Sequence, residues 1–130
     1  QFIRKAVSKE NIVLKSEGLP KRTYCYVIDA VRAIFTVVFR GKAGEAYNIA
    51  NEKSVASIAE VAQKCAEIAG TKVVYELPEA LEQKGFSIPQ NCILENQKLR
   101  ELGWKGKYTL GDGLRETIQT IKMRNEYGKI

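Results

Sequence analysis

The residue types best suited to ligand binding gather at the ends of one apolar stretch, Arg22-Thr-Tyr-Cys-Tyr-Val-Ile-Asp29. In an extended chain, successive residues of this stretch point to opposite faces, and both faces would be largely apolar. This pattern predicts a strand that is buried on both faces. Arg22 stands at the entrance of this strand, where its positive charge could hold an anion. Asp29 stands where the pattern changes to helical spacing, so we expect its carboxylate to cap a helix. The stretch therefore predicts an anion site at one end and a helix cap at the other.

The sequence offers few other groups for catalysis or metal binding. It contains three widely spaced cysteines, Cys25, Cys65 and Cys92, and no histidine. An odd number of cysteines without histidine is typical of core thiols in a reducing compartment and not of a metal site. Without histidine, Ser-His and Cys-His catalysis are excluded as well. We therefore expect no metal site in this chain.

The positive charge is concentrated in the first third of the chain. The formal net charge is +6, and residues 1–42 contain nine Lys or Arg against three Asp or Glu. Residues 43–130 contain twelve of each sign, so their charges cancel. We therefore expect an anionic partner to meet the first third.

Length and composition indicate a single domain over residues 1–130. No apolar run approaches membrane-spanning length and the start does not resemble a signal peptide, so we expect a cytoplasmic protein without a membrane partner. Helical spacing begins at Gln1 with no capping residue before it, which is expected of a domain that belongs to something longer and equally of a chain cut at this point for expression.

Local patterns predict alternating strands and helices. The helices are expected over residues 1–9, 29–40, 58–69, 96–102 and 111–124. The strands are expected over residues 12–14, 22–28, 46–50 and 73–75, with brief pairing at 93–94. This pattern predicts a mixed α/β fold, in which a small sheet of short strands packs with about five helices.

Two of these helices carry clear signals. Ser57 and Glu60 have the spacing of a capping box, and Gly70 is expected to end the helix that they begin. In the helix over residues 29–40, one apolar stripe is expected to be buried in the core. The stripe consists of Ala30, Val31, Ile34, Phe35 and Val38.

Three stretches, in this order, resemble the C-terminal part of the extended short-chain dehydrogenases, the NAD-dependent sugar-nucleotide epimerases, dehydratases and decarboxylases. They are residues 22–29, then Gly44-Glu-Ala-Tyr-Asn-Ile-Ala50, then Asn96-Gln-Lys-Leu-Arg-Glu-Leu-Gly-Trp104. In that family an N-terminal Rossmann half holds NAD and a catalytic Tyr-x-x-x-Lys pair, and the C-terminal half closes over a nucleotide sugar. The resemblance covers nearly the whole chain.

The resemblance implies a substrate-binding domain that is separated from its cofactor half. The chain has no Gly-x-x-Gly-x-x-Gly after a strand, and none of its six tyrosines has a lysine four residues later. We therefore expect a fragment that binds no cofactor, contains no catalytic residue and is not competent alone. NAD and the Rossmann domain would belong to the full-length enzyme.

The resemblance also names substrate-binding positions. Arg22 matches the arginine that contacts the nucleotide diphosphate, although a strand-end arginine paired with an acid is the alternative. Val13 and Lys15 match the segment that meets the base, although strand packing and a solvated lysine explain them too. Many relatives have a second phosphate-binding arginine between the strand near Val73 and the helix near Asn96. Here Lys84 is the only cation in that loop, either as a substitute point charge or as a solvated lysine.

The alternative function is a basic module that binds nucleic acid, or a protein-interaction module. The aromatic residues of the first third mostly occupy core-like positions and no RNA-recognition or helix-turn-helix signature appears, which makes nucleic acid the weaker hypothesis.

Overall fold

The computed structural model describes residues 1–77 and 90–127. The helices are α1 (Phe2–Val7), α2 (Val27–Arg40), α3 (Ile58–Ala69), α4 (Gln97–Glu101) and α5 (Leu110–Tyr127), with a 3-10 turn η1 at Glu52–Ser54. The strands are β1 (Ile12–Leu14), β2 (Lys21–Thr23), β3 (Val55–Ser57) and β4 (Val73–Tyr75). The predicted mixed α/β class is confirmed, with its strands divided between two small sheets.

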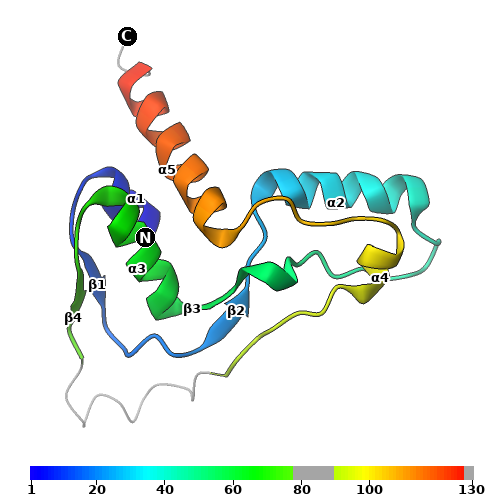
Figure 1. The fold of residues 1–130 in the computed structure, drawn as a ribbon, viewed down its shortest axis with the longest axis horizontal. Coiled ribbons are helices and arrows are strands. Elements are labelled where there is room, and N and C mark those ends of the chain that lie inside the picture. Colours follow the sequence, from blue (N-terminus) through cyan, green and yellow to red (C-terminus); the bar gives the residue numbers. More distant parts are fainter. Residues whose placement is uncertain (78–89, 128–130) are drawn as a thin grey trace.

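Each sheet pairs segments that are far apart in sequence. Strands β1 and β4 are parallel, with Val13 opposite Val74. Strands β2 and β3 are antiparallel, with Arg22 opposite Ala56. The connection between β1 and β2 crosses from one sheet to the other (Figure 1). The two sheets therefore hold the N-terminal third against the middle of the chain.

The larger core lies between the β1–β4 sheet and helices α1, α3 and α5, which gather on one side of the molecule (Figure 1). Its fully buried members include Ile12, Ala62 and Cys65. The smaller core lies under α2, where Ala33, Leu99 and Trp104 are buried together. The structure thus has a compact helical part and a second part built on α2 and α4.

Helix α3 forms as its local sequence predicts. The Ser57 hydroxyl accepts a hydrogen bond from the Glu60 amide at 3.1 Å, and the Glu60 carboxylate accepts one from the Ser57 amide at 2.6 Å. Gly70 ends the helix in the left-handed conformation, with φ of +70°, where a residue with a Cβ would be strained. The capping box and the helix end are confirmed.

Replacing Ser57 by alanine is expected to lower the free energy of unfolding by about 1 kcal/mol, because the Glu60 amide loses its acceptor. Urea denaturation measures this change. The matched control is Ser16→Ala, at an exposed serine in the β1–β2 connection, which is expected to shift the free energy by less than about 0.5 kcal/mol. Equal effects of the two variants would contradict the importance of the cap.

The same capping box predicts that the stability of the fold depends on pH. The hydrogen bond from the Ser57 amide holds the pKa of Glu60 below its usual range. A carboxylate with a lowered folded-state pKa stabilises the fold above its unfolded-state pKa, and this contribution is lost as the pH falls through the folded value. Glu60→Gln is therefore expected to reduce stability at neutral pH and to converge with the wild type in acid, as urea titrations at several pH values would show.

The prediction of a strand over residues 22–28 is wrong beyond Thr23. The ladder of β2 ends there, and the backbone of Tyr24 instead accepts from the Asn51 amide and donates to the Ser54 carbonyl beside η1. Helix α2 already begins at Val27. The strand predicted over residues 46–50 is also absent from the described structure, where these residues form no ladder.

The sequence predicted that Asp29 caps α2, and this prediction is wrong. Tyr26 is the N-cap residue and its side chain makes no capping hydrogen bond. Asp29 lies in the first turn, fully buried, and its carboxylate accepts from the amides of Lys107 and Tyr108. A tertiary contact with a distant loop therefore takes the place of the predicted cap.

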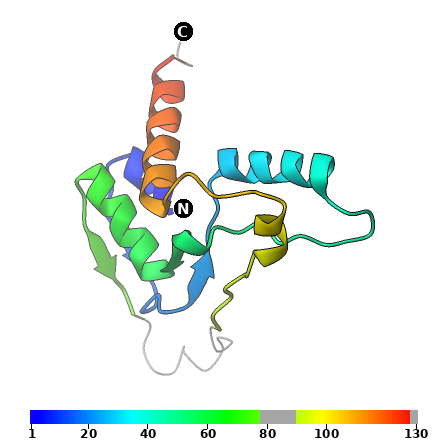
Figure 2. The same cartoon turned by 45° about the vertical axis from the view of Figure 1, so that its right-hand side comes forward.

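The apolar stripe of α2 was also predicted wrongly, because most of it is exposed. Val31, Ile34, Phe35 and Val38 are between 43% and 68% exposed. The buried side of the helix instead carries Asp29 and Ala33. Figure 2 shows α2 at the edge of the molecule, with the connection between α4 and α5 running along one side of it. We call the residues Val27, Val31, Ile34, Phe35 and Val38 the α2 apolar face.

Candidate functional site

The candidate anion site lies at Arg22, in the middle of β2. The Arg22 side chain is partly buried, and its Nη1 donates to the carbonyl of Gln90 at 2.6 Å and to that of Lys21 at 3.3 Å. Both partners are neutral carbonyls. Within residues 1–77 and 90–127, no Asp or Glu lies within ion-pair distance of Arg22. The ion-paired strand-end arginine, the alternative reading of the sequence, is not seen in this part of the chain.

No acidic side chain in the described part of the chain pairs with this guanidinium. A carbonyl partner orients an arginine without neutralising it, and arginine has five N–H donors for further acceptors. The electrostatic influence of Arg22 reaches Tyr24, whose pKa is raised by burial and pushed in the opposite direction by the nearby guanidinium. Arg22 can therefore offer a fixed positive charge to an anion.

The segment from Gln90 to Leu94 runs beside β2 like a third strand. The Cys92 amide donates to the Lys21 carbonyl at 2.9 Å, and Cys92 forms a parallel bridge with Arg22. The Lys21 amide donates to Asn91 Oδ1 at 2.8 Å, and the Leu94 amide donates to Thr23 Oγ1 at 2.9 Å. The brief pairing predicted at residues 93–94 thus occurs at Cys92, with a side-chain contact at Leu94. We call residues 90–94 the β2 flanking segment.

The other predicted binding residues lie apart from Arg22 or outside the described structure. Val13 is partly buried within β1, and Lys15 is exposed just after that strand. Both belong to the β1–β4 sheet, whereas Arg22 belongs to the β2–β3 sheet. Lys84 lies outside the described residues. The structure therefore separates the proposed base contacts from the proposed phosphate contact and joins them through residues 15–20.

Gly18 fixes the path of the connection between β1 and β2. Gly18 has φ of +66°, and its carbonyl accepts a hydrogen bond from the Ala59 amide at 3.0 Å. A Cβ at Gly18 would lie 2.8 Å from the Ala59 nitrogen, which is too close for any side chain. The connection therefore packs against the first turn of α3. This contact fixes the position of β2, and so of Arg22, relative to β1.

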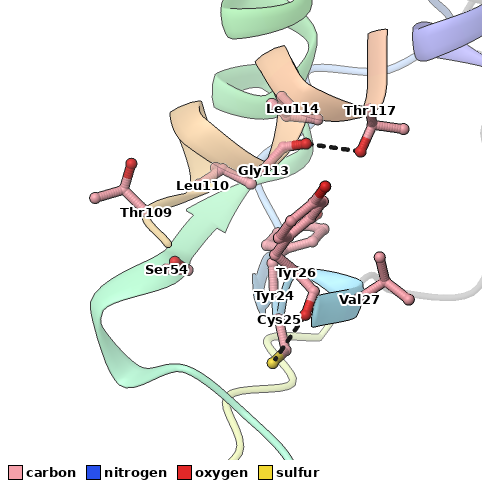
Figure 3. A pocket seen from close by; sticks show the side chains of 10 residues that line it. All are labelled: Tyr24, Cys25, Tyr26, Val27, Ser54, Thr109, Leu110, Gly113, Leu114 and Thr117. Atoms are coloured by element: carbon pink, nitrogen blue, oxygen red, sulfur yellow. Dashed lines mark hydrogen bonds between the residues drawn. The ribbon is translucent and has the colours of Figure 1, made fainter. Parts of the chain in front are cut away.

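Sequence reasoning missed a cavity of about 270 Å³ between residues 24–27 and the first half of α5. Figure 3 shows the rings of Tyr24 and Tyr26 directed toward α5, where the Thr117 hydroxyl donates to the Gly113 carbonyl. A Cβ at Gly113 would lie 3.1 Å from the Tyr26 ring, so the absence of a side chain allows this close approach. The glycine within the helical pattern of α5 is the sequence signal that could have revealed the contact.

The Cys25 thiol of this cavity is poorly suited to act as a nucleophile. The Cys25 thiol lines it and donates to the Tyr26 carbonyl at 3.7 Å. Burial, with a contribution from Asp29, raises the pKa of the Cys25 thiol. A thiol with a raised pKa carries little thiolate at neutral pH, and thiolate is the reactive form. Cys65 is buried as predicted, whereas Cys92 is exposed.

Two further properties concern the described residues alone. Within residues 1–77 and 90–127 there is no group of three or more His, Cys, Asp or Glu that could hold a metal ion. No helix in this part of the chain is both long enough and apolar enough to cross a bilayer.

Comparison with known proteins shows which enzymes this chain resembles. The model of the NAD dependent epimerase/dehydratase family matches residues 1–50. Among curated relatives, dTDP-glucose 4,6-dehydratase of Shigella flexneri is 29% identical over 123 residues, which cover 90% of this chain and 34% of that protein. The chain therefore spans about a third of the length of this relative.

Solved structures agree with this similarity. The dTDP-glucose 4,6-dehydratase of Bacillus anthracis, solved in complex with NAD, is 25% identical with a TM-score of 0.75, covering 97% of this chain and 39% of the other. UDP-glucose 4-epimerase of Thermotoga maritima, solved with UDP-glucose, is 26% identical with a TM-score of 0.75, covering 97% and 38%. The relatives of this chain are thus sugar-nucleotide dehydratases and epimerases, and its fold is that of part of such enzymes.

Proposed function

We propose that this chain is the nucleotide-sugar-binding part of an NAD-dependent epimerase or dehydratase. The observation that carries the proposal is the likeness, over 97% of the chain, to an epimerase solved with UDP-glucose. The positive charge of the first third and the un-neutralised guanidinium of Arg22 support it, because a nucleotide diphosphate is an anion.

In this proposal Arg22 binds the diphosphate. A planar guanidinium can donate two parallel hydrogen bonds to phosphate oxygens, which fixes both position and orientation. Val13 and Lys15 lie at the end of the site that receives the base, and Lys84 is a further candidate for the phosphates. The chain then positions the sugar for a reaction whose chemistry belongs elsewhere in the enzyme.

The chemistry belongs to an N-terminal Rossmann half that holds NAD. NAD, when bound there, supplies hydride transfer. The α2 apolar face supports this division, because a contiguous exposed apolar surface usually marks an interface. Residues 1–130 alone are therefore not a competent enzyme, and the N-terminal half packs on α2.

Arg22→Ala in the full-length protein is expected to weaken the binding of UDP-glucose and dTDP-glucose by about 10- to 100-fold, the typical effect of losing a charge-assisted hydrogen bond. Isothermal titration calorimetry measures the affinity. Arg115→Ala, at an exposed arginine of α5, is the matched control and is expected to change nothing. Unchanged affinity in Arg22→Ala would remove Arg22 from the site, and salt-dependent retention on DNA without nucleotide-sugar binding would replace the proposed function.

A further inference from the structure

The orientation of Arg22 depends on the β2 flanking segment. The guanidinium Nη1 donates to the Gln90 carbonyl at 2.6 Å, the shorter of its two contacts. An arginine side chain has several rotatable bonds, and its binding energy is reduced by the entropy lost when they are fixed. A guanidinium that is already held binds an anion with less of this loss. A shift of the Gln90 carbonyl would therefore change the orientation of the Arg22 guanidinium.

The flanking segment is tied to β2 at both ends. Near Gln90, the Asn91 side chain accepts from the Lys21 amide and the Cys92 amide donates to the Lys21 carbonyl. At the other end, the Leu94 amide donates to Thr23 Oγ1 at 2.9 Å. Thr23 adjoins Arg22 in β2, and its hydroxyl holds the far end of this segment.

We propose that Thr23 is a positioning residue of the anion site: by holding the Leu94 amide, its hydroxyl fixes the flanking segment whose Gln90 carbonyl orients Arg22. This inference rests on the proposed function, since it concerns the same phosphate contact. It extends that function to a residue that makes no contact with the ligand. Thr23 acts only through Arg22.

The test compares Thr23→Val, which is nearly isosteric and lacks the acceptor, with Thr23→Ser, which keeps a hydroxyl. In the full-length protein, Thr23→Val is expected to weaken UDP binding by about three- to ten-fold, in line with the loss of one hydrogen bond. Thr23→Ser is expected to stay within about two-fold of the wild type, because it retains the hydrogen bond. Hydrogen exchange at the Leu94 amide should accelerate in Thr23→Val alone.

Two further measurements separate positioning from a general structural effect. The affinity for uridine, which has no phosphate, should be equal in Thr23→Val and the wild type. In an Arg22→Ala background, Thr23→Val should cause no additional loss of UDP affinity, because the two residues act as one unit.

The outcomes distinguish this inference from the proposed function. If Arg22→Ala weakens UDP binding and Thr23→Val does not, the inference is overturned and the proposed function stands. Equal losses for UDP and uridine, or an additive loss in the Arg22→Ala background, also overturn it. If Arg22→Ala itself leaves UDP affinity unchanged, the phosphate assignment of Arg22 fails and the inference fails with it.

Discussion

Replacing Val31 and Phe35 together by serine is expected to weaken docking of the proposed N-terminal half while leaving this chain folded. Both side chains belong to the α2 apolar face and are 43% and 57% exposed. Full burial of such a side chain contributes about 1.5 to 3 kcal/mol, and docking can bury only the exposed half of each. Losing both therefore weakens docking by about one to two orders of magnitude.

The isolated chain should tolerate the same change. Serine has a helix propensity similar to theirs, so the fold loses mainly the buried half of the two side chains. The free energy of unfolding should therefore fall by about 1 to 3 kcal/mol. In the full-length protein, the variant should lose activity and expose the junction to limited proteolysis. The two readouts together separate a lost interface from a lost fold.

Met123→Ser provides the matched control, because Met123 is similarly exposed at 44% but lies on α5. It is expected to retain wild-type activity and protease resistance. Wild-type activity in the Val31 and Phe35 double variant would show that the α2 apolar face is not covered by the catalytic half. The proposed division of the enzyme would then need a different interface.

Asp29→Ala is expected to destabilise the chain by about 2 to 5 kcal/mol, because two backbone amides lose their acceptor at about 1 to 3 kcal/mol each. Asp29 is fully buried. Its Oδ2 accepts from the amides of Lys107 and Tyr108 at 2.8 and 2.9 Å, and its Oδ1 accepts from Arg32 at 2.7 Å. The alanine variant leaves all three donors without this acceptor, and two of them are backbone amides of the loop before α5.

Urea denaturation of the isolated chain measures this loss. Asp29→Asn is expected to fall between the wild type and Asp29→Ala, since one amide oxygen replaces two carboxylate oxygens. Asp112→Ala is the control for removing an acid near a helix start. Asp112 is partly exposed and, among residues 1–77 and 90–127, accepts from Thr109 and Arg115 alone. A midpoint for Asp29→Ala equal to that of Asp112→Ala would contradict the structural role of the buried carboxylate.

Local sequence was sufficient to predict the bounds of an element wherever that segment carries its own start and stop signals. Helix α3 occurs where Ser57, Glu60 and Gly70 place it, because capping acts between residues three or four apart. Strands β1 and β4 also agree with their predicted bounds. Similarity to sugar-nucleotide dehydratases and epimerases was likewise apparent from short ordered motifs, and the comparisons support it.

Tertiary structure decided the roles of Asp29, of α2 and of Arg22. Periodicity shows that one side of α2 is apolar but not whether anything in this chain covers it, and here the α2 apolar face stays exposed. An aspartate at a helix start looks like a cap, yet Asp29 accepts from amides 78 and 79 residues away. Arg22 is oriented by Gln90, which lies 68 residues away. Hydrogen-bond partners so distant in sequence leave no periodic pattern, so folding alone brings them together.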